Sequence, residues 1–351
     1  MSAHGALAGS KQMVLRTLCG DSLPRFPAGP LAVHYCARLA GVSLRRYSTD
    51  ARTLADCVVR YWERFRPDAV WLSADTWVNA EAMGAAVRFP DDDQPACGAG
   101  EPTVRCAADL ERIGPPDPSR HGRWPLMLEA LGRIRQMIGD EALIVACFDQ
   151  YPFSLACQML GLQRTMLLLC DDRALVEATM ERALEYAVAY AVALARAGAD
   201  MLSGGDSPAV MLGPALYRQI ALPLEQRLVA ALHQAVDVPV SLHICGNTAP
   251  ILADMRRCGA DVYELDWQVS LPQASQVLGP DVTIWGNLDP VGLLARAAPE
   301  QVRQATTELL QTVVRCGRRR FVLSSGCTLA VDTPPENLQA MFDAARNFNT
   351  C

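Results

Sequence analysis

The stretch VPVSLHICGNTAP, residues 238–250, is an apolar, strand-like run that ends in a Gly-Asn turn. Within it, His243 and Cys245 are separated by one residue, so their side chains emerge on the same face of an extended strand. Leu242 and Ile244 then point to the opposite face, where covering helices would pack. A strand that served packing alone would need neither an imidazole nor a thiol at its end. The stretch therefore predicts a buried strand that ends at a chemical site.

Seven further apolar runs share this character, and helix-periodic stretches separate them. The runs are LAVHYC (31–36), DAVWLSAD (68–75), ALIVACFDQ (142–150), GADMLSGGD (198–206), DVYELDWQ (261–268), DVTIWGNLD (281–289) and RFVLSSGC (320–327). The helical stretches include residues 50–65, 172–198, 214–236, 299–317 and 334–348. Continuous apolar strands that are each followed by a helix are typical of a parallel sheet covered on both faces.

Eight such units predict an α/β protein with a (β/α)8 TIM barrel. An open doubly wound sheet is the alternative, although no Gly-x-Gly-x-x-Gly turn opens a helix here. We interpret residues 31–351 as one barrel domain and residues 1–30, rich in Gly, Pro and Ala, as a weakly ordered lead-in. Two loop-rich excursions, residues 88–102 and 112–125, follow the second strand. We expect them at the carboxyl face of the barrel, where loops surround active sites.

The composition excludes several classes of protein. Half of the 351 residues are hydrophobic and the formal net charge is −6, so neither nucleic acid nor an anionic membrane surface is an expected partner. The longest apolar run begins at Ala187, contains Arg196, and is shorter than the roughly 20 residues of a membrane-spanning helix. The thirteen cysteines are scattered and odd in number, and the first residues resemble no secretion signal. We therefore expect a cytoplasmic protein with reduced thiols.

Polar side chains gather where the predicted strands end, and the carboxyl ends of barrel strands open into one mouth. They are Asp75, Asp206, His243, Cys245, Glu264, Asp266, Asn287, Asp289 and Cys327, together with Asn247 in the turn after Cys245. Several of them have a purely structural alternative. Asp75 and Asp206 could cap helices, and Asn287 and Asp289 could form the turn before Pro290.

His243, Cys245 and Cys327 have the side chains of a zinc site. Zinc takes His nitrogen and Cys sulfur at about 2.0–2.3 Å, and separate strands of a closed barrel can direct side chains at a common centre. We expect Asp266 as the fourth ligand, with Glu264 as its supporting residue or its replacement. The alternative is that these cysteines are small core residues, as we expect for most of the thirteen.

The charge of such a site indicates its chemistry. Zinc with two thiolates, one imidazole and one carboxylate is anionic overall, which makes the ion a poor activator of water. The same site suits an incoming thiol, because coordination deprotonates the thiol and leaves it nucleophilic. If the carboxylate leaves as substrate enters, one position becomes exchangeable. Alkyl transfer to a zinc-bound thiolate or a comparable heteroatom follows from this arrangement.

Four stretches resemble a known family. HICGNTAPILADM (243–255), GADVYELDWQVSL (259–271), TIWGNLDPVGLL (283–294) and FVLSSGCTLAVDTPPENLQAM (321–341) are similar to the C-terminal half of the uroporphyrinogen decarboxylase superfamily. The similarity is to its corrinoid-dependent methyltransferase branch, typified by the methylcobalamin:coenzyme M methyltransferases. The resemblance implies a (β/α)8 barrel with zinc on His243, Cys245 and Cys327, and with Asp266 as a ligand before substrate enters.

The resemblance also implies the reaction, which is methyl transfer between a corrinoid and a zinc-activated thiol or a methoxylated or phenolic substrate. The corrinoid, cobalamin itself or one carried by a corrinoid protein, is expected to come from outside the chain, in which no corrinoid-binding module is visible. We assign catalytic roles to Asp206, Glu264 and Asp266, and contacts with the substrate or corrinoid to Asp75, Asn247, Asn287 and Asp289. The sequence also allows a homodimer.

Two other functions remain open at this point. A decarboxylase of the same superfamily needs no metal and binds a polycarboxylate porphyrinogen through an arginine-rich N-terminal segment. The equivalent stretch here, HYCARLAGVSLRRY (34–47), offers Arg38 but departs from that pattern. A non-catalytic corrinoid-binding partner is the third interpretation. Four aromatic residues could line an apolar slot for a ring or could belong to the core: Trp77, Tyr151, Phe153 and Trp267.

Overall fold

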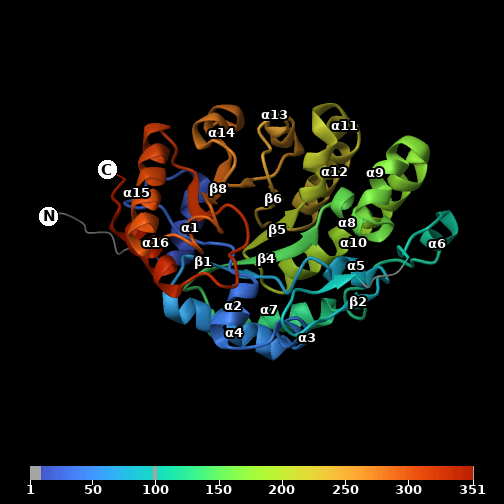
Figure 1. Cartoon of the computed structure of the whole chain (residues 1–351), viewed down its shortest axis with the longest axis horizontal. Coiled ribbons are helices and arrows are strands. Elements are labelled where there is room, and N and C mark those ends of the chain that lie inside the picture. The colour runs from blue at the N-terminus through green and yellow to red at the C-terminus, as the bar shows by residue number, and fades with distance from the viewer. Residues whose placement is uncertain (1–8, 98–100, 351) are drawn as a thin grey trace.

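A seven-stranded parallel sheet forms the centre of the protein in a computed structural model that describes residues 9–97 and 101–350. The strand order is β1-β4-β5-β6-β7-β8-β9, so each strand lies beside the next one along the chain. The sheet curls into a TIM-like arrangement with helices outside it (Figure 1). The strands are β1 (Ala69–Leu72), β4 (Leu143–Gln150), β5 (Met201–Gly205), β6 (Ser241–Ile244), β7 (Val262–Leu265), β8 (Thr283–Leu288) and β9 (Phe321–Ser325).

Sixteen α-helices are present among the described residues, and most of them cover the outer face of the sheet (Figure 1). They are α1 (Ser10–Cys19), α2 (His34–Ala40), α3 (Leu44–Thr49), α4 (Ala51–Phe65), α5 (Val78–Ala82), α6 (Ala107–Glu111), α7 (Trp124–Ile138), α8 (Pro152–Leu160), α9 (Leu162–Asp171), α10 (Arg173–Arg196), α11 (Gly213–Gln219), α12 (Ala221–Ala235), α13 (Leu252–Met255), α14 (Leu271–Leu278), α15 (Pro299–Arg315) and α16 (Pro335–Asn347). Two short 3-10 helices are η1 (Ser207–Leu212) and η2 (Arg256–Cys258). The helix predicted over 214–236 is two helices, because the chain breaks at Ile220.

Seven of the eight predicted strands are confirmed, and the first, over residues 31–36, is wrong. Helix α2 begins at His34, buries Tyr35, Cys36 and Ala37, and leaves Arg38 exposed. A short apolar run cannot be told from a buried helical turn by periodicity alone, which explains the error. No eighth regular strand is present in the described part of the chain.

The extended segment 27–29 occupies the gap between the two end strands. The Gly29 amide donates to the Leu323 carbonyl on β9 over 2.9 Å, and the Leu323 amide donates to Pro27 over 2.9 Å. On the other side, the Asp68 amide, just before β1, donates to the Ala28 carbonyl over 2.8 Å. The segment therefore links β9 to β1 without forming a full strand.

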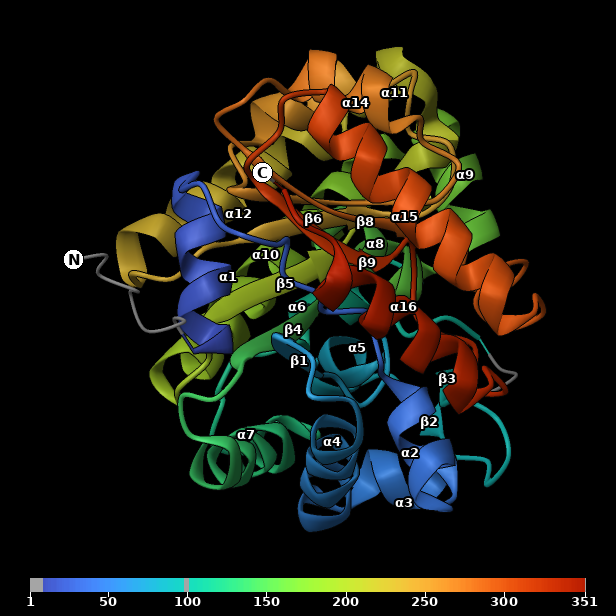
Figure 2. The same cartoon turned by 90° about the vertical axis from the view of Figure 1, so that its left-hand side faces the viewer.

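The inside of the sheet is filled by its own apolar layer. Trp71 and Trp285 meet edge to face with ring centroids 5.9 Å apart, and both indole N–H groups donate to the Gly29 carbonyl, over 3.3 and 2.8 Å. A Cβ at Gly29 would lie 2.9 Å from both Ala69 and Trp285, so this position requires glycine. Helix α1 covers the end where the strands begin, with Val14 packed into this layer (Figure 2).

The predicted excursions follow β1. Residues 88–102 include part of a small antiparallel hairpin, β2 (Val87–Arg88) and β3 (Ala96–Cys97), and residues 112–125 lead into α7. Residues 9–30 of the predicted lead-in include α1 and the linking segment 27–29, whereas residues 1–8 lie outside the described residues. Within the described chain, only the bent pair α8 and α9 has the combined length and apolar composition of a membrane span, and neither helix has them alone.

Candidate metal centre and adjoining cavities

Three predicted ligands meet at the carboxyl end of the sheet. His243 is on β6, Cys245 follows that strand, and Cys327 follows β9. The His243 Nε2 atom is 3.0 Å from the Cys245 sulfur, and the two sulfurs are 3.5 Å apart. All three donor atoms lie within 4.8 Å of one another. Two sulfurs bound tetrahedrally to zinc would be about 3.8 Å apart, so the three side chains fit the ion with little movement.

The orientation of His243 is fixed by its second ring nitrogen. Nδ1 is 3.0 Å from the backbone carbonyl of Glu264, which can only accept, so Nδ1 carries the proton. In the neutral ring, Nε2 then directs its lone pair at the two sulfurs. Metal-binding histidines are commonly held this way, through the nitrogen that does not face the ion.

Protons are shared unequally among the three side chains. The hydrogen bond between the two sulfurs is the largest cause of both pKa shifts. It lowers the pKa of Cys245 and raises the pKa of Cys327 to about 12. Burial would lower the pKa of His243, but the Cys327 sulfur and the Glu264 carboxylate outweigh it and raise the pKa to about 9. A divalent cation would replace these protons, since its ligands are thiolates and neutral imidazole.

Asp266, predicted as the fourth ligand, lies outside this group of three. Its Oδ2 accepts the Gly246 amide over 2.8 Å and its Oδ1 accepts the Gln268 amide over 2.9 Å. Both carboxylate oxygens therefore hold backbone, and one of them fixes the turn directly after Cys245. This arrangement gives Asp266 a supporting position beneath the turn.

Glu264 also lies outside this group of three, but it is an acidic residue of the cavity into which the group opens. It is the cross-strand neighbour of His243, it is 2% exposed, and it lines the same cavity as the three predicted ligands. Its Oε1 accepts the hydroxyls of Ser203, over 2.7 Å, and Ser241, whereas Oε2 is buried without a hydrogen-bond partner among the described residues. Burial raises the pKa of Glu264. Before an ion binds, a fourth ligand would have a buried oxygen without a hydrogen-bond partner, and Glu264 has such an oxygen.

The three predicted ligands open into a cavity of about 180 Å³. Its walls come from the ends of β1, β4, β5, β6 and β7 and from the segments before α2 and after β9. They consist of Leu31, Val33, His34, Trp71, Ser73, Asp75, Thr76, Gln94, Cys147, Asp149, Gln150, Ser203, Gly204, Gly205, Ser207, His243, Cys245, Glu264, Cys327 and Thr328. None of these described wall residues is arginine or lysine.

Asp75 lines the cavity but is fully engaged by its neighbours. Its carboxylate accepts both terminal nitrogens of Arg123, over 2.5 and 3.1 Å, and the Trp77 amide, over 2.8 Å. Arg123 also pairs with Glu81 over 2.5 Å, and its guanidinium lies 4.6 Å from the centre of the Phe89 ring. The ion pair is buried, so it fixes the second excursion against the end of β1. No local pattern in the sequence indicates that Arg123 reaches Asp75.

Other predicted site residues serve the turns around the cavity. The Asn287 side-chain amide donates to the carbonyls of Asp266 and Val269, over 3.1 and 2.9 Å. Asp289 Oδ1 accepts two amides of the following turn over 2.9 Å each, and Asn247 Oδ1 accepts the Ala249 amide over 3.2 Å. None of Asn247, Asn287 and Asp289 lines the cavity described above.

Asp206 is fully buried behind the cavity wall. It accepts the Ser154 amide over 2.7 Å and the Ser154 hydroxyl over 2.6 Å, and burial raises its pKa to about 6. It therefore joins β5 to α8, while the next residue, Ser207, lines the cavity and accepts the Cys245 amide over 3.3 Å. The structure assigns Asp206 a positioning role and does not bring it to the three predicted ligands.

Two cavity residues were missed in the sequence. His34 belongs to the wrongly predicted first strand, and its Nε2 lies 2.8 Å from the Ala74 carbonyl. Asp149 has a left-handed backbone conformation, with φ at 68°, and its Oδ2 accepts the Asn79 amide over 2.9 Å. Burial, followed by the charge of Asp75, raises the pKa of Asp149 well above its usual range. Its place at the end of a predicted strand was the one signal available.

A second cavity, of about 500 Å³, adjoins the first. The two share Thr76, Gln150 and Ser207 as a common wall. Trp77 lines this second cavity, as expected for a slot, whereas Tyr151 and Phe153 are core residues and Trp267 is 49% exposed. The remaining lining residues are Cys97, Glu101, Pro102, Ser154, Cys157, Gln158, Gly161, Leu162 and Pro208, again without arginine or lysine in the described lining.

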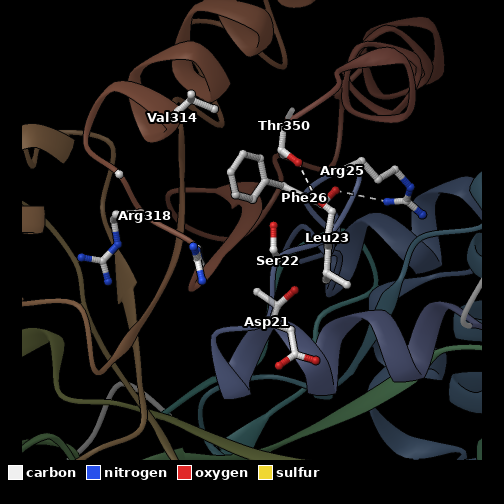
Figure 3. Close-up of a pocket in the computed structure, with 11 residues that line it drawn as sticks. Asp21, Ser22, Leu23, Arg25, Phe26, Val314, Arg318 and Thr350 are labelled. Atoms are coloured by element: carbon white, nitrogen blue, oxygen red, sulfur yellow. Dashed lines mark hydrogen bonds between the residues drawn. The ribbon is translucent and has the colours of Figure 1, made fainter.

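A separate hollow of about 320 Å³ lies near the start of β9, and Figure 3 shows the residues that line it. Arg25 and Arg318 lie on opposite sides of it, and both guanidinium groups extend away from its centre. Arg25 pairs with Asp68 over 2.7 Å, and Arg318 donates to the carbonyls of Gly279 and Val282. These arginines hold the chain together at the end where the strands begin. In this architecture that end serves stability, and the active site lies at the other end.

The comparisons with known proteins identify the family of the chain. The chain matches the uroporphyrinogen decarboxylase (URO-D) family over residues 10–348. It is 28% identical over 293 residues to a uroporphyrinogen decarboxylase of Trichlorobacter lovleyi, which covers 80% of this chain and 81% of that protein. It is 31% identical over 284 residues to the methylcobamide:CoM methyltransferase MtbA of Methanosarcina acetivorans, which covers 80% of each. A solved methyltransferase from Methanosarcina mazei has a TM-score of 0.86 at 26% identity and covers 96% of this chain and 98% of that one.

Proposed function

Because the chain belongs to the uroporphyrinogen decarboxylase family, we propose that it is a zinc-dependent methyltransferase of that family. It would move a methyl group between a corrinoid and a thiol or a methoxylated or phenolic substrate. The convergence of His243, Cys245 and Cys327 within 4.8 Å is the single observation that carries this proposal. The relatives named as methyltransferases support it.

The three side chains, with Glu264 in place of the predicted Asp266, would hold the ion. Glu264 has an unpaired buried oxygen in the described structure, whereas both oxygens of Asp266 bind backbone amides. Zinc bound here would keep a thiol or phenol as its anion at neutral pH. The chain's own contribution is positional, because Glu264 fixes the His243 tautomer through its carbonyl and Asp266 fixes the turn that carries Cys245.

The two adjoining cavities support a reaction between two substrates. The smaller one holds the predicted ligands, and the larger one reaches it past Thr76, Gln150 and Ser207. In the proposed transfer, the corrinoid would supply the methyl group and keep the electron pair of its cobalt–carbon bond. The thiol would lose its proton to solvent and form the new carbon–sulfur bond.

A metal-free tetrapyrrole decarboxylase is the second candidate, since several relatives carry that name. A porphyrinogen carries several carboxylates that would need cationic partners. Neither cavity has an arginine or lysine among its described lining residues, and Arg38, which is exposed on α2, lines neither of them. This absence of charge partners favours methyl transfer over decarboxylation. The third candidate is a non-catalytic protein that binds a corrinoid, and the assay described below distinguishes it from a methyltransferase.

The partner and the location belong to the same proposal. We infer that the corrinoid arrives free or on a separate corrinoid protein, and that the chain works in the cytoplasm, as a homodimer or alone. The twelve described cysteines are all free thiols, which supports a reducing compartment.

The test is incubation of the purified protein with methylcobalamin and a panel of thiols, phenols and tetrahydrofolate, with cobalt demethylation followed by absorbance. We expect one zinc per chain and demethylation that is lost in Cys327→Ala. Cys170→Ala, which changes an exposed cysteine at the end of α9, is the matched control. Release of carbon dioxide from uroporphyrinogen by metal-free protein would overturn the proposal, and cobalamin binding without methyl exchange would indicate the non-catalytic function.

A further inference from the structure

His34 is a partly buried histidine in the wall of the smaller cavity, at the first position of α2. The segment before it is fastened to the segment that carries Cys327. The Leu31 amide donates to the Ser325 hydroxyl over 3.2 Å, and the Leu31 carbonyl accepts from the Leu329 amide over 2.9 Å. These two hydrogen bonds lie on either side of Cys327 in the sequence, so they hold His34 and one of the predicted ligands at the same cavity.

The backbone fixes the tautomer of the His34 ring. Its Nε2 atom lies 2.8 Å from the Ala74 carbonyl, which can only accept, so Nε2 carries the proton of the neutral ring. Ala74 is the one hydrogen-bond partner of this ring in the described chain, and the Tyr47 ring packs against it edge to face with centroids 6.1 Å apart. Nδ1 therefore has a lone pair that can accept a proton.

The surroundings of His34 favour its neutral form. Burial lowers the pKa of His34, and the hydrogen bond to Ala74 and the charges of Asp75 and Asp93 oppose this shift without reversing it. Asp75 is itself paired with Arg123, and Asp93 is exposed. The imidazole is therefore a neutral base at neutral pH.

The other ionisable groups of the described cavity wall are poorly suited to accept a proton. Asp75 is held in a buried ion pair. Burial raises the pKa of Asp149 well above its usual range and also raises the pKa of the Cys147 thiol, which favours the protonated form of both. Glu264 and the three predicted ligands belong to the proposed metal centre. His34 remains as the neutral base of this cavity.

We propose that His34 is a catalytic base that takes the proton of the incoming thiol through Nδ1. The S–H bond breaks, its electron pair stays on sulfur, and an N–H bond forms at Nδ1. The proton then passes to solvent, which restores the neutral ring. The inference rests on the proposed function and adds a residue to it. A purely structural donor to the Ala74 carbonyl would not need a second nitrogen with a lone pair.

Heteronuclear NMR of the imidazole nitrogens tests this base in the metal-free protein, without any reaction. We expect neutral His34 to carry its proton on Nε2 and to titrate below the usual pKa of histidine. The signal is assigned by its absence in His34→Gln. A neutral ring protonated at Nδ1, or a ring that is already cationic at neutral pH, overturns the inference, because neither form can accept a proton at Nδ1.

The reaction is tested with two thiols of equal chain length and different acidity. His34→Gln removes the base and keeps a side-chain N–H that can donate to Ala74. Methyl transfer from methylcobalamin is measured at neutral pH with ethanethiol and with the more acidic 2,2,2-trifluoroethanethiol. We expect kcat/KM to fall about 100-fold for ethanethiol and less than about threefold for the fluorinated thiol, because a thiol that ionises readily in water needs no base. His233→Gln, which changes an exposed histidine on α12, is the matched control and should leave both values unchanged.

The outcomes separate this inference from the proposed function. An equal loss for both thiols would reduce His34 to a residue that holds the cavity wall, and no loss for ethanethiol would show that the base is not needed. Either result overturns the inference and leaves the methyltransferase proposal intact. Weaker zinc binding by His34→Gln in competition with a chelator would also overturn the assigned role. Absence of transfer from methylcobalamin to every thiol in the wild type would overturn the proposed function, and this inference with it.

Discussion

The Cys327 sulfur is the part of the proposed metal centre that comes from furthest along the chain. It approaches the Cys245 sulfur to 3.5 Å from the other side of the sheet opening, after β9. Protein zinc sites of this ligand type bind with about 10–16 kcal/mol, so one ligand in four contributes about 3 kcal/mol. We therefore expect Cys327→Ala to weaken zinc binding by about two orders of magnitude.

The measurement is competition for zinc against a chromophoric chelator, paired with thermal unfolding. Cys327 is only partly buried and takes no part in the apolar core, so Cys327→Ala should unfold within a few degrees of the metal-free wild type. Cys170→Ala should bind zinc as the wild type does. If Cys327→Ala keeps its zinc with a dissociation constant within about threefold of wild type, the three side chains do not form one site and the reasoning fails.

Three further predictions concern the residues around the centre. Glu264→Gln should weaken zinc binding about 10–100-fold and more than Asp266→Asn does, measured with the same chelator; the reverse order would return Asp266 to the ligand position. Arg123→Met should destabilise the fold by about 3–5 kcal/mol in urea unfolding, because it leaves Asp75 buried without its cation; a loss under about 1 kcal/mol would contradict this. Burial and the charge of Asp206 raise the pKa of Glu225, so stability should fall as pH rises above the unfolded pKa of about 4.3. Glu225→Gln should reduce that fall, and an unchanged dependence of stability on pH in this variant would refute the prediction.

The sign of the last prediction follows from proton binding. The folded protein holds the Glu225 proton at pH values where the unfolded chain has released it. Folding is therefore favoured by this group at low pH, and the contribution is lost as pH rises towards the folded pKa. Tyr217 donates to Glu225 over 2.5 Å and remains able to donate to the amide oxygen of the glutamine variant.

The centre itself could be predicted because it depends on two regular features of strands. The two-residue period places His243 and Cys245 on one face, and parallel strands of a curled sheet end at one edge. Cys327 could be predicted in the same way, because it lies at the carboxyl end of the last strand. Both features are properties of repeated backbone geometry, so they survive small errors in where each strand begins and ends.

The choice between Asp266 and Glu264 could not be made from the same features. Both residues are on one face of β7 or its extension, two positions apart, and both are acidic. Their roles differ because the turn after Cys245 turns the Gly246 amide towards Asp266, which occupies that carboxylate. A turn of irregular backbone has no repeating pattern in the sequence, so strand periodicity could not predict its hydrogen bonds.

Arg123 and Asp149 were missed for a related reason. Arg123 belongs to a loop that returns to β1 from more than forty residues away, and nothing local marks its partner. Asp149 points into the cavity because its backbone leaves the extended conformation at φ 68°. Strand periodicity assumes extended backbone, so it assigns the wrong direction to a side chain at such a position.

The wrongly predicted first strand connects the fold to the site. Three residues, 27–29, suffice to join β9 to β1, because Gly29 fits between Trp71 and Trp285 where a longer strand with side chains would not. The chain then turns at Leu31, whose amide donates to the Ser325 hydroxyl and whose carbonyl accepts from Leu329, on either side of Cys327. The residues released from the sheet in this way, Leu31 to His34, become a wall of the cavity. The shortened strand thus explains both the error in the prediction and the presence of a polar residue, His34, in the wall of the cavity that holds the three predicted ligands.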